Sequence, residues 1–474
     1  MTEPAESLPG TPPRTGDGLG KCGNFAARFS AREGDFSLQP CGFPAVEKRQ
    51  KNDADGDVWR RRHDRERMRA ALRTLVFAGA LPSHGVRGCR VRAIPPYRYG
   101  KPTGFSGLIE LRHHQEQASV HHYHGRRTCR SLLVCPDCAA EFGPFLRERV
   151  QAGTRRLLAA GYFCFMLTLT AQHGRETPLA ELSAGFQEAK RWFTSHKTWK
   201  MIKQQLGIIG GFSALEVTDD APEAPANVRT GFHWHQHVLL FYNPAGGFRG
   251  WFTEKTAGTI ERRLRRLWQR SLRQFGLDCS LEHGARLSLP RRRGVEMLQD
   301  AGAGFEGCDP ASAQAAALYV SKGLSWELTG SAVATKQGRR GERSSMWDIL
   351  RRIADGDAAL IPRYAEYMAA VRGRSFLRWS QGLAQFCGMP EDEAALLDDA
   401  PRVAGDVVDY AWSDRAFSSV ARGVQETAIR RIADEAGEDA PEAIDRAMRA
   451  IDSGCDPMTG EELPPGTMFR GRAT

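Results

Sequence analysis

Three histidines alternate along one short stretch of the chain, at His233, His235 and His237. Successive side chains of a β-strand point to opposite faces, so these imidazoles would share one face of a strand. The apolar run at 238–241 predicts that the strand continues into a buried core. A row of imidazoles on a rigid strand is suited to hold a divalent metal ion. The plainer interpretation is three histidines that are hydrogen-bonded or face solvent.

A carboxylate ligand is expected from the strand before the histidines. Residues 210–218 are typical of a strand, and the polar, proline-containing stretch 219–230 is typical of a turn or loop. The two strands are therefore expected to form a hairpin, which could bring Glu216 opposite the histidines. Two imidazoles and one carboxylate leave positions on a metal open for substrate oxygens. The alternative is that Glu216 is a surface residue of its strand.

An earlier apolar run at 162–170 predicts another strand, and Thr168 and Thr170 would share one of its faces. Their hydroxyls could support metal ligands through hydrogen bonds. The strand preference of threonine explains the two residues equally well.

Tyr319 and Lys322 lie three residues apart in a stretch, 311–328, that is typical of a helix, so they would share one helix face. A tyrosine phenolate can attack phosphorus, and Lys322 could lower the phenol pKa or hold a phosphate. A Tyr and a Lys one turn apart also occur in many helices without any function.

A separate cluster contains Cys129, Cys135 and Cys138. In a cytosolic protein, two cysteines separated by two residues are typical of half a zinc site. A structural Zn²⁺ could take its fourth ligand from His121, His122 or His124. The alternative is a set of core thiols without a metal.

Composition limits the class of protein. The chain has 474 residues, of which 41% are hydrophobic and 26% charged, as in a soluble globular protein. The net charge of +10 favours a polyanionic partner, most often nucleic acid. There is no apolar stretch of about 18 residues and no secretory signal, so we expect a cytoplasmic protein with no membrane partner. The 11 cysteines are scattered and odd in number, which favours reduced thiols.

Four regions are expected along the chain. Residues 1–57 are rich in Pro, Gly, Ser and charge and are expected to be disordered. Residues 58–145 combine a basic helix at 58–78 with the Cys/His-rich element. The arginines of that helix are expected either to be solvated or to contact a DNA backbone.

The other two regions differ in architecture. Residues 146–385 mix strands with helices, including one long helix at 179–205, which predicts an α+β fold with helices packed on a sheet. Residues 386–474 are acidic and look helical around 420–451, as a partner surface or a solvated tail.

Four segments now form an ordered set: 165–170 (FMLTLT), 214–218 (ALEVT), 231–241 (GFHWHQHVLLF) and 319–322 (YVSK). Together they resemble the rolling-circle plasmid replication initiators, the Rep proteins of the HUH endonuclease superfamily, over roughly residues 125–385 of this chain. The resemblance implies an antiparallel-sheet HUH nuclease core and a Mg²⁺ or Mn²⁺ cofactor. It also implies plasmid origin DNA as substrate, single-stranded or cruciform, with a host helicase and polymerase as partners. Tyr319 would form a 5′-phosphotyrosyl link and free a 3′-hydroxyl primer, and the strands would later be rejoined.

The family pattern is His-hydrophobic-His followed by apolar residues, and two registers fit it. His235 and His237 directly precede the apolar run, although Gln236 between them is polar. His233 and His235 enclose an apolar Trp234 but have a poorer continuation. We prefer His235 and His237, with His233 as the alternative register. Some relatives carry a carboxylate one helical turn before the tyrosine, where this chain has Ala315, so the resemblance does not explain the second strand transfer.

Two other functions remain open from the sequence. The chain could be a zinc-containing DNA-binding regulator without catalysis, or an HUH transposase or relaxase. No GxxxxGK[ST] segment is present, so a fused P-loop helicase is not expected.

Overall fold

A computed structural model describes much of the chain between residues 54 and 462, and all structural statements below concern those residues. The described residues are 54–82, 85–98, 101–102, 106–171, 177–219, 231–243, 254–281, 284–291, 294–297, 344–388, 407–413, 416–417, 420, 425–453 and 455–462. Residues 1–53 of the N-terminal segment lie outside them, as do Tyr319 and Lys322. None of the described helices is long and apolar enough to cross a membrane.

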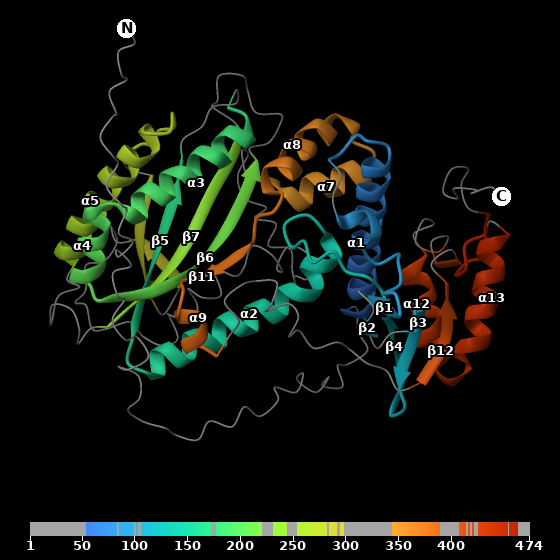
Figure 1. Cartoon of the computed structure of the whole chain (residues 1–474). Helices are drawn as coiled ribbons and strands as arrows, with labels where there is room; N and C mark the ends of the chain where they lie inside the picture. Colours follow the sequence, from blue (N-terminus) through green and yellow to red (C-terminus); the bar gives the residue numbers. More distant parts are fainter. Residues whose placement is uncertain are drawn as a thin grey trace, which may run out of the picture. The chain divides into compact units, whose positions relative to one another are not determined.

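The main element is an antiparallel sheet in the order β10-β6-β7-β5-β8-β9, with β11 also paired to β6 (Figure 1). Its strands are β5 Phe163–Thr170, β6 Ile208–Asp219, β7 Phe232–Tyr242, β8 Ala285–Arg291, β9 Gly294–Met297, β10 Ser344–Ser345 and β11 Leu377–Trp379. The antiparallel pairing of β6 with β7 confirms the pairing expected for these strands. With the surrounding helices, it also confirms the α+β class.

Helices cover the face of this sheet that carries Trp234. Phe186 of α3 (Leu179–Ser195) contacts Trp234 of β7, with ring centroids 6.5 Å apart. Phe186 also packs on Trp268 of α5 (Glu254–Arg273), with centroids 5.0 Å apart. Figure 1 shows α3 and α5 beside the sheet. Because side chains alternate along β7, its three histidines lie on the opposite face.

The prediction of one long helix at 179–205 is wrong, because the helix is interrupted at His196. α3 ends at Ser195, and α4 (Lys197–Gln205) begins after His196, whose backbone is extended at φ −67° and ψ 142°. The His196 side chain accepts a hydrogen bond from the Thr198 backbone N–H and so caps α4. Thr194 and Ser195 donate their hydroxyls to backbone carbonyls of the preceding turn, a competition that weakens helix continuation.

Several further helices pack between the main sheet and helix α1 near the N-terminus. α2 (Pro136–Ala159) begins at Pro136, where the missing N–H of proline costs no helical hydrogen bond. The short helices η2 Gly85–Gly88, α7 Met346–Ala354, η4 Ala358–Leu360, α8 Ile361–Val371 and α9 Leu383–Phe386 complete this part, with the two-residue strands β1 Tyr97–Arg98 and β2 Lys101–Pro102.

A second, three-stranded sheet brings together residues almost 300 positions apart. Its order is β12-β3-β4, formed by β12 Val407–Trp412, β3 Ile109–His114 and β4 Gln117–His124. It is packed with α12 Glu426–Ala436, η5 Gly437–Asp439 and α13 Ala440–Asp452. The shared core includes Leu111, Trp412, Phe417, Ile429 and Ile444, each at most 3% exposed. The region expected as a partner surface or a solvated tail therefore folds onto the Cys/His-rich element.

The expected basic helix is α1 (Ala54–Phe77), and several of its charges serve the fold. Arg69, 2% exposed, pairs with Asp137 of α2 and with Glu426 of α12. Glu66 accepts hydrogen bonds from the backbone N–H groups of Glu426 and Thr427, at 2.6 and 3.0 Å. Arg69 and Glu66 thus hold α1 to its neighbours, and the Arg69 guanidinium is engaged within the protein.

Candidate active site and metal centre

The expected site residues lie in two adjacent rows across the sheet. In one row Glu216 of β6 pairs with His235 of β7, which pairs with Thr170 of β5. In the next row Ala214 pairs with His237, which pairs with Thr168. Directly paired residues of antiparallel strands share a face, so Glu216, His235, His237 and both threonines lie on the same side. The structure therefore brings these five predicted residues together.

The two threonines orient the two histidine rings. Thr170 Oγ1 lies 2.8 Å from His235 Nδ1, and Thr168 Oγ1 lies 3.0 Å from His237 Nδ1. Each hydroxyl contacts Nδ1, so a metal ion would bind each ring through Nε2. Groups that hold the second ring nitrogen fix the orientation of a ligating histidine. The hydrogen bonds foreseen for Thr168 and Thr170 are thus present in the structure.

Glu216 and His237 already share a contact point. Glu216 Oε2 lies 2.7 Å from His237 Nε2, and the Glu216 side chain is 43% exposed while that of His237 is 11% exposed. The carboxylate and the Nε2 atom therefore face the same point, and solvent reaches it from the Glu216 side. Glu216 and His237 thus meet at one point, with His235 beside them on the same face of the sheet.

His233 lies one step further along β7. It pairs with Thr218 of β6, and its ring stacks on that of His235, with centroids 5.7 Å apart and planes 3° apart. The rings of His235 and His237 follow at 6.5 Å and 16°. Glu216 pairs with His235 and hydrogen-bonds to His237. This geometry favours the register of His235 and His237 over the one that includes His233.

One residue of this face was not singled out in the sequence. Arg286 of β8 pairs with Thr168 and so continues the row of His237. Its Nε atom is buried and has no hydrogen-bond partner among the described residues. A guanidinium beside the histidines can bind a phosphate group. The only signal in the sequence was the position of Arg286 in a short expected strand.

A second candidate centre is formed by four cysteines. Cys129, Cys135 and Cys138 meet Cys89, and their four sulfur atoms all lie within 4.8 Å of one another. Cys89 Sγ is 3.6 Å from Cys135 Sγ and 3.5 Å from Cys138 Sγ. Four sulfurs arranged tetrahedrally about 2.3 Å from a zinc ion would be about 3.8 Å apart. The spacing therefore fits a Cys₄ zinc site.

The fourth residue of this centre is Cys89, so the expectation of a histidine ligand is wrong. His122 instead contacts Arg430, His124 contacts Glu110, and His121 belongs to another cluster. Cys89 was missed because it follows η2, forty residues before Cys129, with no second cysteine near it in the sequence.

The cysteine cluster favours a thiolate. The pKa of the Cys138 thiol is lowered well below its usual value, because Cys129, Cys135 and Cys89 donate hydrogen bonds to it and the Arg90 guanidinium attracts the charge. A thiolate is the form that binds metal ions.

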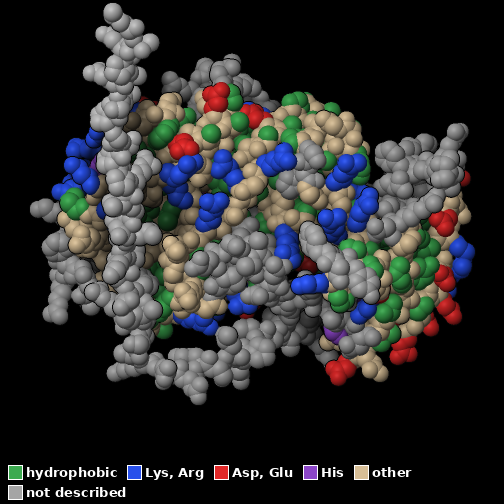
Figure 2. Space-filling view, viewed as in Figure 1, with side chains coloured by type: hydrophobic (Ala, Val, Ile, Leu, Met, Phe, Trp, Pro, Cys, Tyr) green, Lys and Arg blue, Asp and Glu red, His purple; other side chains and the backbone are tan. Residues whose placement is uncertain are grey.

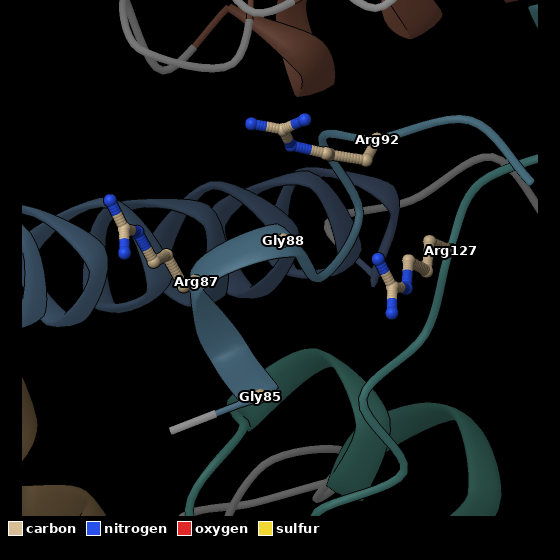
Figure 3. A pocket seen from close by; sticks show the side chains of 5 residues that line it. All are labelled: Gly85, Arg87, Gly88, Arg92 and Arg127. Carbon is tan, nitrogen blue, oxygen red and sulfur yellow. The ribbon is translucent and has the colours of Figure 1, made fainter. Parts of the chain in front are cut away.

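A basic pocket lies next to this cluster. It has a volume of about 480 Å³, and three of its lining residues are Arg87, Arg92 and Arg127, with Gly85 and Gly88 between them (Figure 3). Arg127 donates its backbone N–H to Arg92 O at 2.6 Å, so these two arginines lie on paired segments. No acidic side chain is among the described lining residues. The three arginines make this part of the surface basic, and the Arg87 guanidinium stacks on the Phe77 ring at 4.2 Å.

Charge is unevenly distributed over the surface. Figure 2 shows Lys and Arg side chains spread over one face, while Asp and Glu gather over the C-terminal helices. The exposed acidic residues of α12, η5 and α13 are Glu435, Glu438, Asp439, Glu442, Asp445 and Asp452.

A curated protein of Streptomyces lividans, described as "Protein rep", is 22% identical to this chain. The alignment extends over 383 residues and covers 69% of this chain and 80% of that protein. No protein-family model and no solved structure matches the chain.

Proposed function

We propose that this chain is a replication initiator that nicks one DNA strand at a plasmid origin and later rejoins strands, in the manner of the HUH Rep proteins. The observation that carries the proposal is the placement of Glu216, His235 and His237 on one face of paired strands, with a threonine hydroxyl behind each histidine. The similarity to a protein named "Protein rep" supports the replication role independently.

The roles of the site residues follow from their atoms. Nε2 of His235, Nε2 of His237 and the carboxylate of Glu216 would hold a Mg²⁺ or Mn²⁺ ion. When bound, such an ion supplies positive charge that polarises the scissile phosphate. Thr168 and Thr170 would keep each Nδ1 engaged and each Nε2 directed to the site. Because two of the three ligands are imidazoles, we expect Mn²⁺ to support activity better than Mg²⁺.

Tyr319 is proposed as the nucleophile. Its Oη forms a bond to phosphorus while the bond from phosphorus to the 3′-oxygen breaks; the phenol loses its proton, and the 3′-oxygen gains one. The phosphotyrosyl ester keeps the energy of the broken phosphodiester, so rejoining needs no ATP. Lys322, one helical turn away in the expected helix, would stabilise the phenolate or hold a phosphate.

DNA would be held through its phosphates. The net charge of +10 and the pocket of Arg87, Arg92 and Arg127 both suit a polyanion. Arg286 would bind a phosphate beside the histidines. The substrate is origin DNA in single-stranded or cruciform form, and the freed 3′-hydroxyl would prime a host polymerase, with a host helicase opening the duplex.

The four cysteines are proposed to bind a structural Zn²⁺. Such an ion would join the segment after η2, the segment before α2 and the first turn of α2. This centre positions the arginine pocket, because Cys89 directly follows Gly88 of its lining.

The test is incubation with labelled single-stranded origin DNA and Mn²⁺, followed by denaturing gel electrophoresis. We expect the downstream fragment to be linked to the protein through its 5′-phosphate. This product should be lost in Tyr319→Phe and reduced in Glu216→Gln, while Tyr410→Phe, a tyrosine of the second sheet, retains it. Lack of cleavage of the correct origin with metal present would refute the proposal.

The runner-up is a zinc-containing DNA-binding regulator without catalysis, favoured by the cysteine cluster and its adjacent arginine pocket. A regulator would bind the same DNA, and Tyr319→Phe would leave every activity unchanged.

A further inference from the structure

A buried cluster of imidazoles and carboxylates lies in the second sheet and has no part in the proposed strand transfer. His113 of β3 and His121 of β4 pair directly across the sheet, and Asp409 of β12 meets both. His113 Nδ1 lies 2.7 Å from Asp409 Oδ2, and His121 Nε2 lies 3.3 Å from the same oxygen. The three ligand atoms lie within 4.8 Å of one another.

The cluster is enclosed by the protein. The His121 side chain is fully buried, and those of His113 and Asp409 are 10% and 3% exposed. It lies at the edge of the apolar core, because His113 is on the same strand face as Leu111. Imidazoles and a carboxylate at such a position require a partner that compensates for lost hydration.

The backbone of β12 directs Asp409 to this point. Val408 pairs with Arg112 and Tyr410 with Leu111, so Asp409 between them is the extra residue of a β-bulge. A bulge turns a side chain away from the regular alternation of a strand. Val407 pairs with His113, so Asp409, two residues further on, lies on the His113 face, and the bulge brings Tyr410 to that face as well.

A second carboxylate orients His121. Asp434 Oδ1 of α12 lies 3.0 Å from His121 Nδ1 and accepts the His121 backbone N–H at 2.6 Å. Nδ1 therefore carries the proton that it donates to Asp434. His121 Nε2 is buried and makes no hydrogen bond to the described residues, although Asp409 is near. A carboxylate behind one ring nitrogen with the other nitrogen left as an acceptor is the usual arrangement of a metal-ligating histidine.

We propose that His113, His121 and Asp409 form a third metal site, for a divalent transition ion such as Zn²⁺, with Asp434 as the residue that positions His121. Ligands about 2.0–2.1 Å from a tetrahedral zinc ion would be about 3.3 Å apart, close to the spacing of His121 and Asp409. The positive charge of the ion would balance the carboxylates of Asp409 and Asp434. Three protein ligands leave one position for water.

The site would fasten the C-terminal region to the Cys/His-rich element. Its ligands come from the β3–β4 hairpin and from β12, and Asp434 adds α12. The β3–β4 hairpin and β12 are almost 300 residues apart in the sequence, so a bound ion would reinforce the pairing of β12 with β3. This is a structural role distinct from that of the ion expected at Glu216.

The test measures zinc bound to the full-length protein after chelation, reloading and dialysis, by elemental mass spectrometry. We expect Asp409→Asn and His121→Gln each to bind one equivalent of zinc per chain less than the wild type. His122→Gln is the matched control, since His122 is next to His121 on the opposite strand face, and it should bind the wild-type amount. Equal zinc in Asp409→Asn and the wild type would overturn the proposal, and would mean that protonated imidazoles balance the carboxylates instead.

A second measurement needs no variant. Crystals of the zinc-loaded wild type should show an anomalous difference peak at the zinc edge between His113, His121 and Asp409. A map with peaks elsewhere and none at this position would equally overturn the site, even if the variants fail to fold.

Discussion

The substitution Thr170→Val tests whether the threonines hold the histidines ready to bind a metal ion. Valine has nearly the shape of threonine and favours strands at least as strongly, so β5 should be unaffected. The change removes only the hydroxyl that lies 2.8 Å from His235 Nδ1. The His235 ring would then lose the partner that fixes its orientation and leaves Nε2 available.

The expected loss can be estimated from that single hydrogen bond. A hydrogen bond of this kind contributes about 0.5–1.5 kcal/mol. Since roughly 1.4 kcal/mol is a factor of ten, the Kd for Mn²⁺ should rise by up to about tenfold. Residues that support metal ligands commonly change metal affinity by about 10–100-fold, so tenfold is a conservative expectation. Thr168→Val should act similarly through His237.

The assay is calorimetric titration of the full-length protein with Mn²⁺, which needs no knowledge of the origin sequence. Thr218→Val is the matched control, because Thr218 lies on the same face but pairs with His233. We expect the Mn²⁺ affinity of this variant to stay within about twofold of the wild-type value. If Thr170→Val also bound Mn²⁺ as tightly as wild type, the hydroxyl would have no role in positioning His235. If Thr218→Val alone weakened binding, the register that includes His233 would be the correct one.

Three further predictions concern other parts of the molecule. Cys89→Ser should remove one equivalent of zinc and lower the Tm, as measured by elemental analysis and calorimetry. Cys455→Ser, which changes a cysteine outside the cluster, should do neither. Unchanged zinc in Cys89→Ser would exclude Cys89 as a ligand. Arg127→Ala and Arg92→Ala should each weaken binding to DNA of any sequence. Each should also reduce the slope of log K against log salt concentration by about one unit, as measured by anisotropy titrations at several salt concentrations. An unchanged slope would mean that these arginines do not contact phosphates. Burial and the nearby Glu426 raise the pKa of Glu66 from 4.5 to about 8, so the folded state retains a proton that the unfolded state loses, and stability should fall as the pH rises from 4.5 to 8. Glu66→Gln should flatten that pH profile of the Tm, and an identical profile would contradict the raised pKa.

The sheet site could be predicted largely because its information is local. Alternation along a strand places the histidines on one face, and a short connection makes antiparallel pairing with the strand of Glu216 the expected outcome. The same rule places Thr168 and Thr170 on one face of their strand. Arg286 could not be assigned, since its neighbour in the sheet depends on which strand edge β8 joins.

The predictions from the sequence were wrong or incomplete where segments far apart in the chain meet, and where a local side-chain hydrogen bond competes with helix formation. Cys89 completes the cysteine cluster from forty residues away, and no spacing rule connects it to the others. The pairing of β12 with β3 spans almost 300 residues, so the acidic composition of the C-terminal region gave no sign of its core. At His196 a side-chain cap outweighs the helical pattern on both sides.

We propose that Glu216, His235 and His237 bind the metal ion for a covalent strand transfer in which Tyr319 is the nucleophile. Mass spectrometry of the proteolysed protein after reaction with origin DNA and Mn²⁺ tests it most directly. We expect one peptide carrying a nucleotide 5′-phosphate on Tyr319, absent without metal and absent in His237→Ala. A nucleotide on another of the 9 tyrosines, or an adduct that forms equally well in His237→Ala, would contradict it.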